Sequence, residues 1–189
     1  MKKALLILDL DETLIHATTT PLENQTAFCV VFDEYHIYIR PYLKAFLDET
    51  QKHFDLAIWS SASDDYVHEV AKNTILSEYK LQFIWGRSRA TYRRNLEQDD
   101  LSIVGSDSHY HYVKSLKKVK KMGYPIERIL IVDDSPHKSK MNFGNAIYPN
   151  SFEGDLADND LELLSRYLIS IKDQENFRKL EKRGWRAKV

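Results

Sequence analysis

Two pairs of aspartates are the residues of this 189-residue chain whose type and spacing point most directly to chemistry. Asp9 and Asp11 follow one short apolar run, and Asp133 and Asp134 follow another. Carboxylates at the end of a buried strand need a cation or dense hydrogen bonding, because burying an unpaired charge is costly. Mg²⁺ prefers such oxygen ligands. The pattern predicts a shared magnesium site, and the alternative is two separate pairs that cap turns.

Two further side chains could act on an anion bound beside these aspartates. Ser60 also follows an apolar run, and it would offer a hydroxyl and an N–H group where a strand meets a helix, a natural anion site. Lys114 could neutralise an aspartate or a bound phosphate. Taken alone, Ser60 is equally well a turn residue and Lys114 a surface lysine.

Strands that alternate with helices must position these residues. We expect strands at 4–8, 54–59, 81–85, 128–132 and 146–147, and helices that begin near 41 and 63 and cover 112–122 and 161–169. This alternation predicts an α/β fold, a Rossmann-like parallel sheet with helices on both faces. Ligands bind beyond the carboxyl ends of such strands, which is where the four aspartates and Ser60 would converge.

The remainder of the chain adds two features to this sheet. Two β-rich runs around Asp33-Glu34 predict a hairpin flap over about residues 26–40. An arginine-rich stretch over about residues 86–107 reads as an insertion. We expect residues 1–189 to form a single domain.

Composition excludes several classes of protein. Hydrophobic residues make up 43% of the chain, too many for a disordered protein. With 27 Lys and Arg against 28 Asp and Glu, the chain lacks the basic excess of a general nucleic-acid binder. No apolar run is long enough for a membrane span or a signal peptide. Cys29, the single cysteine, leaves no internal disulfide, so we expect a cytoplasmic protein, or a nuclear one in a eukaryote.

Four segments together resemble the motifs of haloacid dehalogenase superfamily phosphatases. They are residues 7–14, 59–62, 112–114 and 131–136, in the order of the family's first to fourth motifs. Within that superfamily the chain resembles the small phosphatases of the RNA polymerase II carboxy-terminal domain, the NLI-interacting-factor-like group. Arg40-Pro41 and Tyr66 also look like that branch, and the resemblance spans about residues 4–168.

The resemblance implies a role for each motif residue. Asp9 would be the nucleophile that forms an aspartyl-phosphate, and Asp11 the general acid and base. Thr13 would orient the loop, while Ser60 and Lys114 would hold phosphoryl oxygens. Mg²⁺ would be bound by the Asp9 carboxylate, the Asp11 backbone carbonyl and the pair Asp133 and Asp134.

The chain also departs from the family pattern. The branch usually has threonine where Ser60 stands, and residues 87–90 lack the family's cysteine. Arg87 and Arg89 begin the insertion, where we expect them to bind an anionic substrate together with Arg40 and Tyr66. A solvated, charged loop is the alternative for the two insertion arginines.

These observations predict a magnesium-dependent phosphomonoester hydrolase that acts on phosphoserine or phosphothreonine in a protein. A small phosphorylated metabolite or a polynucleotide 3′-phosphate is the second substrate class. A non-catalytic binding module on the same fold is a third interpretation, which the presence of both Asp9 and Asp11 disfavours. A receiver domain is a fourth, but its acceptor aspartate normally ends a middle strand, whereas here that strand ends in Trp59-Ser60. We expect no membrane partner.

Overall fold

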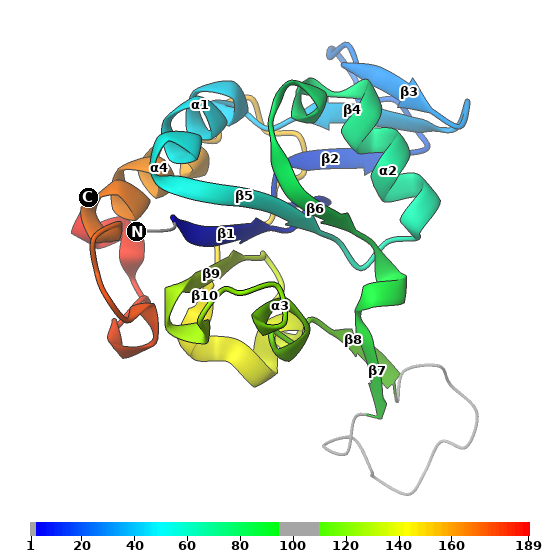
Figure 1. Ribbon diagram of the computed structural model, residues 1–189. Coiled ribbons are helices and arrows are strands. Elements are labelled where there is room, and N and C mark those ends of the chain that lie inside the picture. Colours follow the sequence, from blue (N-terminus) through cyan, green and yellow to red (C-terminus); the bar gives the residue numbers. More distant parts are fainter. Residues whose placement is uncertain (1–2, 95–109) are drawn as a thin grey trace, which may run out of the picture.

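A five-stranded parallel sheet forms the centre of the computed structural model, which describes residues 3–94 and 110–189 (Figure 1). Its strand order is β10-β9-β1-β5-β6, and every neighbouring pair is parallel. The strands are β1 (Ala4–Leu8), β5 (Phe54–Trp59), β6 (Leu81–Trp85), β9 (Ile129–Val132) and β10 (Ala146–Ile147). The Rossmann-like sheet expected from the sequence is therefore confirmed.

Both faces of the sheet are buried, which explains why its strands are apolar without alternation. In β1, Leu6 and Leu8 join one apolar cluster, and Leu5 and Ile7 join a second cluster on the opposite face. Helices α1 (Leu43–His53), α2 (Asp64–Asn73) and α4 (Asp160–Ile171) contribute to the first cluster, and residues around the short α3 (Lys117–Lys120) contribute to the second. The helices thus cover both faces (Figure 1).

The path of the chain creates a switch point beside β1. The chain runs from β1 to β5 and β6 on one side, and then returns to β9 and β10 on the other side. Ligand sites in open parallel sheets lie at such a point, outside the carboxyl ends of the strands. Asp9 follows β1, Ser60 follows β5 and Asp133 follows β9.

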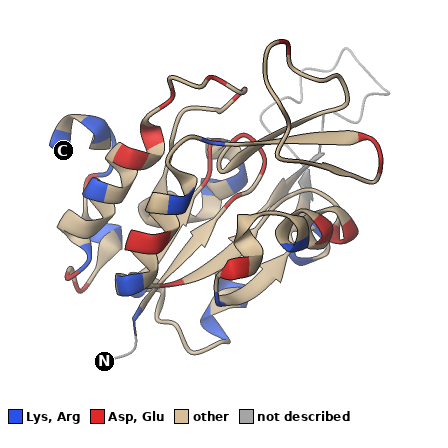
Figure 2. Cartoon of the chain, turned by 90° about the horizontal axis from the view of Figure 1, so that it is seen from above, with Lys and Arg blue, Asp and Glu red and all other residues tan. Residues whose placement is uncertain are grey.

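Short 3-10 helical segments complete the connections. They are η1 (Ile75–Glu78), η2 (Arg87–Arg89), η5 (Ile126–Arg128), η6 (Pro136–Asn145), η7 (Phe177–Lys179) and η8 (Trp185–Lys188). Lys and Arg recur along the C-terminal segment, while charges of both signs are interspersed over the helices (Figure 2). Within the described ranges, no helix combines the length and the apolar character needed to cross a membrane.

The expected flap is present as part of a three-stranded antiparallel sheet with the order β2-β4-β3. Its strands are β2 (Ile15–Thr18), β3 (Cys29–Val31) and β4 (Tyr35–Ile39). The turn begins one residue earlier than the sequence suggested, because Phe32 and Asp33 both have a φ of 54°. Two consecutive residues with positive φ form a turn whose twist matches the twist of the two hairpin strands.

The expectation of a helix over residues 112–122 is wrong for most of that range. Tyr112 and Val113 belong to β8 (Tyr110–Val113), which pairs with β7 (Thr91–Arg94), and only Lys117–Lys120 is α-helical. Cross-strand pairing, including a Tyr92–Tyr112 ring contact at 5.1 Å, outweighs the local helical pattern. The part of the expected insertion at 95–107 lies outside the described residues.

Arg40, which we expected to bind substrate, is fully buried, and its guanidinium is engaged by other residues of the chain. Its Nε and Nη2 donate to the two carboxylate oxygens of Asp158 at 2.8 and 2.7 Å, and its Nη1 donates to the Thr13 carbonyl at 3.0 Å. Asp160 lies 3.5 Å from the same guanidinium and also pairs with Arg186. Arg40 thus ties the end of the flap to the loop after β1 and to the start of α4.

We expect Arg40→Met to lower the free energy of unfolding by about 3–5 kcal/mol, because it leaves the largely buried Asp158 carboxylate without its cation. Urea unfolding followed by circular dichroism measures this change. Lys44→Met is the matched control, since its ion pair with Asp48 is exposed and such pairs contribute only about 0–1 kcal/mol. Equal losses in both variants would contradict a structural role for Arg40.

Candidate active site

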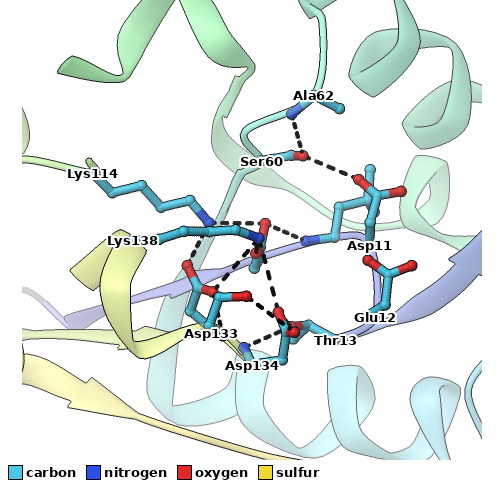
Figure 3. A network of polar contacts seen from close by, with 12 residues as sticks. Asp11, Glu12, Thr13, Ser60, Ala62, Lys114, Asp133, Asp134 and Lys138 are labelled. Carbon is cyan, nitrogen blue, oxygen red and sulfur yellow. Dashed lines mark hydrogen bonds and ion pairs between the residues drawn. The ribbon is translucent and has the colours of Figure 1, made fainter. Parts of the chain in front are cut away.

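The carboxyl ends of the parallel strands bring together the polar residues expected from the sequence (Figure 3). Asp9, Ser60 and Asp133 are at most 1% exposed, and Lys114, which follows β8, is fully buried. Backbone hydrogen bonds fix this edge, because the Asp9 N–H donates to the Val132 carbonyl at 2.9 Å. The four motifs therefore meet at one place.

Lys114 lies between two buried carboxylates. Its Nζ is 2.8 Å from Asp9 Oδ1 and 2.7 Å from Asp133 Oδ2. Burial alone would raise the pKa of Asp9, but the ammonium groups of Lys114 and Lys138 hold that pKa below its ordinary range. Burial and repulsion from Asp9 raise the pKa of Asp133 to about 7. Asp9 is therefore the carboxylate of this pair that is held ionised.

Lys138 is the site residue that sequence reasoning missed. It lies in η6, and its Nζ is 3.1 Å from Asp9 Oδ2 and 3.9 Å from both Asp133 Oδ1 and Asp134 Oδ1. Although burial opposes the charged form, Asp9 and Asp133 raise the pKa of Lys138 above its usual value. Its spacing four residues after Asp134, on a helical segment opened by Pro136, is the signal that could have found it.

The Asp11 carboxylate lies outside the cluster formed by Asp9, Asp133 and Asp134. It accepts hydrogen bonds from the Tyr66 hydroxyl at 2.7 Å and from the Ser60 hydroxyl at 3.2 Å. Burial raises its pKa, the Tyr66 hydrogen bond opposes that shift, and repulsion from Asp9 adds to it. The Ser60 hydroxyl in turn accepts the Ala62 N–H at 3.0 Å, which fixes its orientation (Figure 3).

Thr13 joins the loop after β1 to the loop after β9. Its hydroxyl oxygen accepts the Asp134 N–H at 3.2 Å, and Asp134 Oδ1 lies 3.4 Å from the same oxygen. The turn before it contains Glu12 with a φ of 56°, and burial with repulsion from Asp11 and Asp134 raises the pKa of Glu12 to about 7. Thr13 is fully buried, consistent with orienting the loop rather than contacting a ligand.

Three of these carboxylates could hold a metal ion. Asp9, Asp133 and Asp134 offer ligand oxygens that all lie within 4.8 Å of one another. Three oxygen donors of this kind fit a hard divalent cation such as Mg²⁺. The Asp11 carboxylate is not part of this cluster and faces Tyr66 and Ser60 instead, so only its backbone carbonyl remains a predicted ligand.

A cavity of about 680 Å³ opens beside Asp11 between the flap and the start of α2. Its lining combines acidic, aromatic and small residues with one arginine: Asp11, Glu12, Ala17, Phe32, Glu34, Tyr35, Ala62, Ser63, Tyr66 and Arg87. Tyr66, which we expected to bind substrate, lines this cavity, and its hydroxyl donates a hydrogen bond to Asp11.

The two arginines expected to bind substrate differ in position. Arg87 lines the cavity, donates from Nε to the Ser61 carbonyl at 2.9 Å and stacks over Tyr112 with 5.2 Å to the ring centre. Arg89 is absent from the lining and lies over the Trp85 ring at 5.4 Å. The close approach that brings η2 to this rim needs Gly86, because an added Cβ would lie 2.7 Å from Asp64 Cα.

The curated proteins that match this chain include several CTD small phosphatase-like proteins. The chain is 28% identical over 181 residues to CTD small phosphatase-like protein 2 of Dictyostelium discoideum, covering 93% of this chain and 29% of that protein. It is 25% identical to the human CTD small phosphatase-like protein, covering 84% of this chain and 52% of the relative. The chain therefore spans about half or less of the length of these relatives.

Solved structures share the fold. The fission yeast RNA polymerase II CTD phosphatase Fcp1 bound to beryllium fluoride matches with a TM-score of 0.55 at 19% identity, covering 94% of this chain and 53% of that one. Residues 4–178 match the family described as NLI interacting factor-like phosphatase. Since this match includes all four motifs that meet at the sheet edge, the chain belongs to the NLI interacting factor-like phosphatase family.

Proposed function

We propose that this chain hydrolyses phosphomonoesters through an aspartyl-phosphate on Asp9, with phosphoserine or phosphothreonine of a protein as substrate. The observation that carries the proposal is the environment of Asp9, a buried carboxylate between two ammonium groups at 2.8 and 3.1 Å. A carboxylate can attack a phosphate dianion only where cations offset the repulsion between them. Lys114 supplies one such cation, and a divalent metal at the acidic cluster would supply further positive charge.

The two halves of the reaction use Asp9 and Asp11 in turn. An oxygen of Asp9 forms a bond to phosphorus while the bond from phosphorus to the alcohol oxygen breaks. Asp11 gives its proton to that leaving oxygen. Water then attacks phosphorus and gives a proton to Asp11, and the bond to Asp9 breaks to release inorganic phosphate. Burial favours the protonated form that Asp11 needs for the first step.

The remaining site residues bind and orient. Lys114 and the Ser60 hydroxyl would contact phosphoryl oxygens, and Thr13 holds the loop to Asp134. Asp9, Asp133 and Asp134, with the Asp11 carbonyl, would hold Mg²⁺, which supplies positive charge to the reacting phosphate. Tyr66 is assigned to orienting Asp11, because its hydroxyl donates to that carboxylate at 2.7 Å.

A protein substrate is supported by the shape of the cavity and by the relatives. The cavity is bounded by the flap, where Phe32 is 54% exposed, and by Arg87. A rim that combines apolar side chains with charged groups of both signs suits the chain that flanks a phosphorylated side chain. Relatives that match most of this chain are named CTD small phosphatase-like proteins, although this chain spans only part of their length.

Hydrolysis of p-nitrophenyl phosphate with and without Mg²⁺ tests the activity. Comparison of phosphopeptides with phosphorylated metabolites and 3′-phosphorylated oligonucleotides then tests the substrate class. Magnesium-dependent turnover with a preference for phosphopeptides supports the proposal. Absence of turnover on every substrate would identify a non-catalytic binding module instead.

Asp9→Asn is expected to abolish turnover while the chain stays folded, because the amide keeps the shape of the nucleophile but not its charge. Steady-state rates on p-nitrophenyl phosphate measure the loss, and circular dichroism checks the fold. Asp55→Asn, a substitution of the same chemistry on β5 beside Tyr124, should retain wild-type turnover. A folded Asp9→Asn enzyme with unchanged kcat would overturn the assigned nucleophile.

Asp11→Asn should separate proton transfer from metal binding. We expect kcat to fall by roughly 10²–10⁴-fold, the usual contribution of general acid–base catalysis. The Mg²⁺ dissociation constant from calorimetric titration should stay near the wild-type value, since the Asp11 carboxylate lies outside the acidic cluster. Loss of Mg²⁺ binding in this variant would contradict the division of roles.

Arg87→Ala should raise KM for a phosphopeptide with an acidic residue beside the phosphoserine and leave kcat/KM on p-nitrophenyl phosphate nearly unchanged. Losing one charge-assisted hydrogen bond costs about 1.5–3 kcal/mol, or about 10–150-fold in kcat/KM. Arg89→Ala is the matched control, because Arg89 does not line the cavity. Equal losses on both substrates would place Arg87 at the reacting phosphate, contrary to this assignment.

A further inference from the structure

The two lysines of the site occupy different sides of the same carboxylates. Lys114 contacts Asp9 Oδ1 and Asp133 Oδ2. Lys138 instead faces Asp9 Oδ2, at 3.1 Å, and the Oδ1 atoms of Asp133 and Asp134, each at 3.9 Å. Lys138 is therefore the lysine that reaches all three acids of the metal-binding cluster.

We propose that the Lys138 ammonium competes with the divalent cation for the cluster of Asp9, Asp133 and Asp134, so that each excludes the other. This inference rests on the proposed metal-dependent function and assigns a residue that controls access of the metal. A single set of carboxylates cannot hold a divalent cation and an ammonium group at the same point, because the two cations repel each other strongly at such short range.

The two lysines differ in how easily their ammonium groups can move away from the carboxylates. Lys114 is fully buried at the end of β8, and its backbone carbonyl is held by the Asn142 side chain at 2.6 Å. The Lys138 side chain is 19% exposed and lies on a short 3-10 segment at the rim. Its long, unbranched stem can carry the ammonium group into water when another cation arrives. Lys138 is thus the displaceable cation and Lys114 the fixed one.

The balance of charge gives Lys138 a role in the metal-free protein. Three carboxylates crowded at a buried edge would repel one another in the metal-free protein. With Lys138 in place, two ammonium groups offset most of that charge, so the loop geometry persists before the metal binds. The consequence is a weaker apparent affinity for the metal, since binding must first displace the lysine.

Calorimetric titration with Mg²⁺ compares wild-type protein with Lys138→Met, which keeps the length of the side chain but removes its charge. We expect the Mg²⁺ dissociation constant to fall by about tenfold or more. Lys121→Met is the control, because Lys121 is exposed and forms no ion pair with any residue in the described ranges. Its dissociation constant should stay within about twofold of wild type, since bulk charge is screened.

A second measurement uses the wild-type chain and does not depend on how the variant folds. Brief acetylation with acetic anhydride, followed by mass spectrometry, reports the accessibility of each lysine with Mg²⁺ and without it. We expect Mg²⁺ to increase labelling of Lys138 severalfold, while Lys114 stays protected and Lys121 stays constant. Calcium ions serve as a second probe of the same oxygen ligands.

The outcomes separate this inference from the proposed function. Tighter Mg²⁺ binding by Lys138→Met, together with increased labelling of Lys138 in the wild type, supports competition. Equal dissociation constants, or labelling of Lys138 that falls or does not change with Mg²⁺, overturn competition but leave the metal-dependent phosphatase intact. Absence of Mg²⁺ binding by both proteins overturns the competition and the assignment of the metal together.

Discussion

Neutralisation of buried negative charge is the constraint on which this structure depends. Asp9 and Asp133 are at most 1% exposed at the ends of adjacent parallel strands, where isolated carboxylates would be very costly. Lys114 bridges them, and it is itself fully buried. Each of the three offsets part of the cost of burying the other two, so the charges at the sheet edge stabilise one another as a single ionic unit.

That unit requires several segments to be placed accurately. β1 and β9 bring the two aspartates side by side through their parallel pairing. The Lys114 N–H donates to the Lys138 carbonyl at 2.9 Å, which joins the end of β8 to η6. Thr13 fixes one loop to the other from the opposite side. The polar contacts therefore join three connections, those that follow β1, β8 and β9.

The sequence predicted those parts of the fold that depend on local patterns. Continuous apolar runs such as Ala4–Leu8 reveal strands buried on both faces, and a polar residue directly after each run marks the edge that binds ligands. Asp9, Asp133 and Ser60 were found in this way. The acidic residues of the first and fourth motifs could likewise be predicted, because each motif consists of a few consecutive residues.

What escaped prediction depends on contacts between distant parts of the chain. Arg40 resembled a substrate-binding residue, but its partners Asp158 and Asp160 lie 118 and 120 positions away, and only the tertiary structure reveals that they bury it. The Tyr112 region had a helical pattern, yet pairing with β7 made it a strand. Lys138 resembles a surface lysine in the sequence, and only the path of η6 places its ammonium group beside Asp9.

The C-terminal segment contributes contacts that reach the site. The match to the family model ends at residue 178, and beyond it Trp185 is 2% exposed and donates from Nε1 to the Tyr148 carbonyl at 3.0 Å. Arg186 pairs with Asp160, which in turn lies beside Arg40, and Arg40 holds the Thr13 carbonyl. The contacts that hold the site therefore extend beyond the segment matched by the family model, and they connect Arg186 to the loop that carries Asp11.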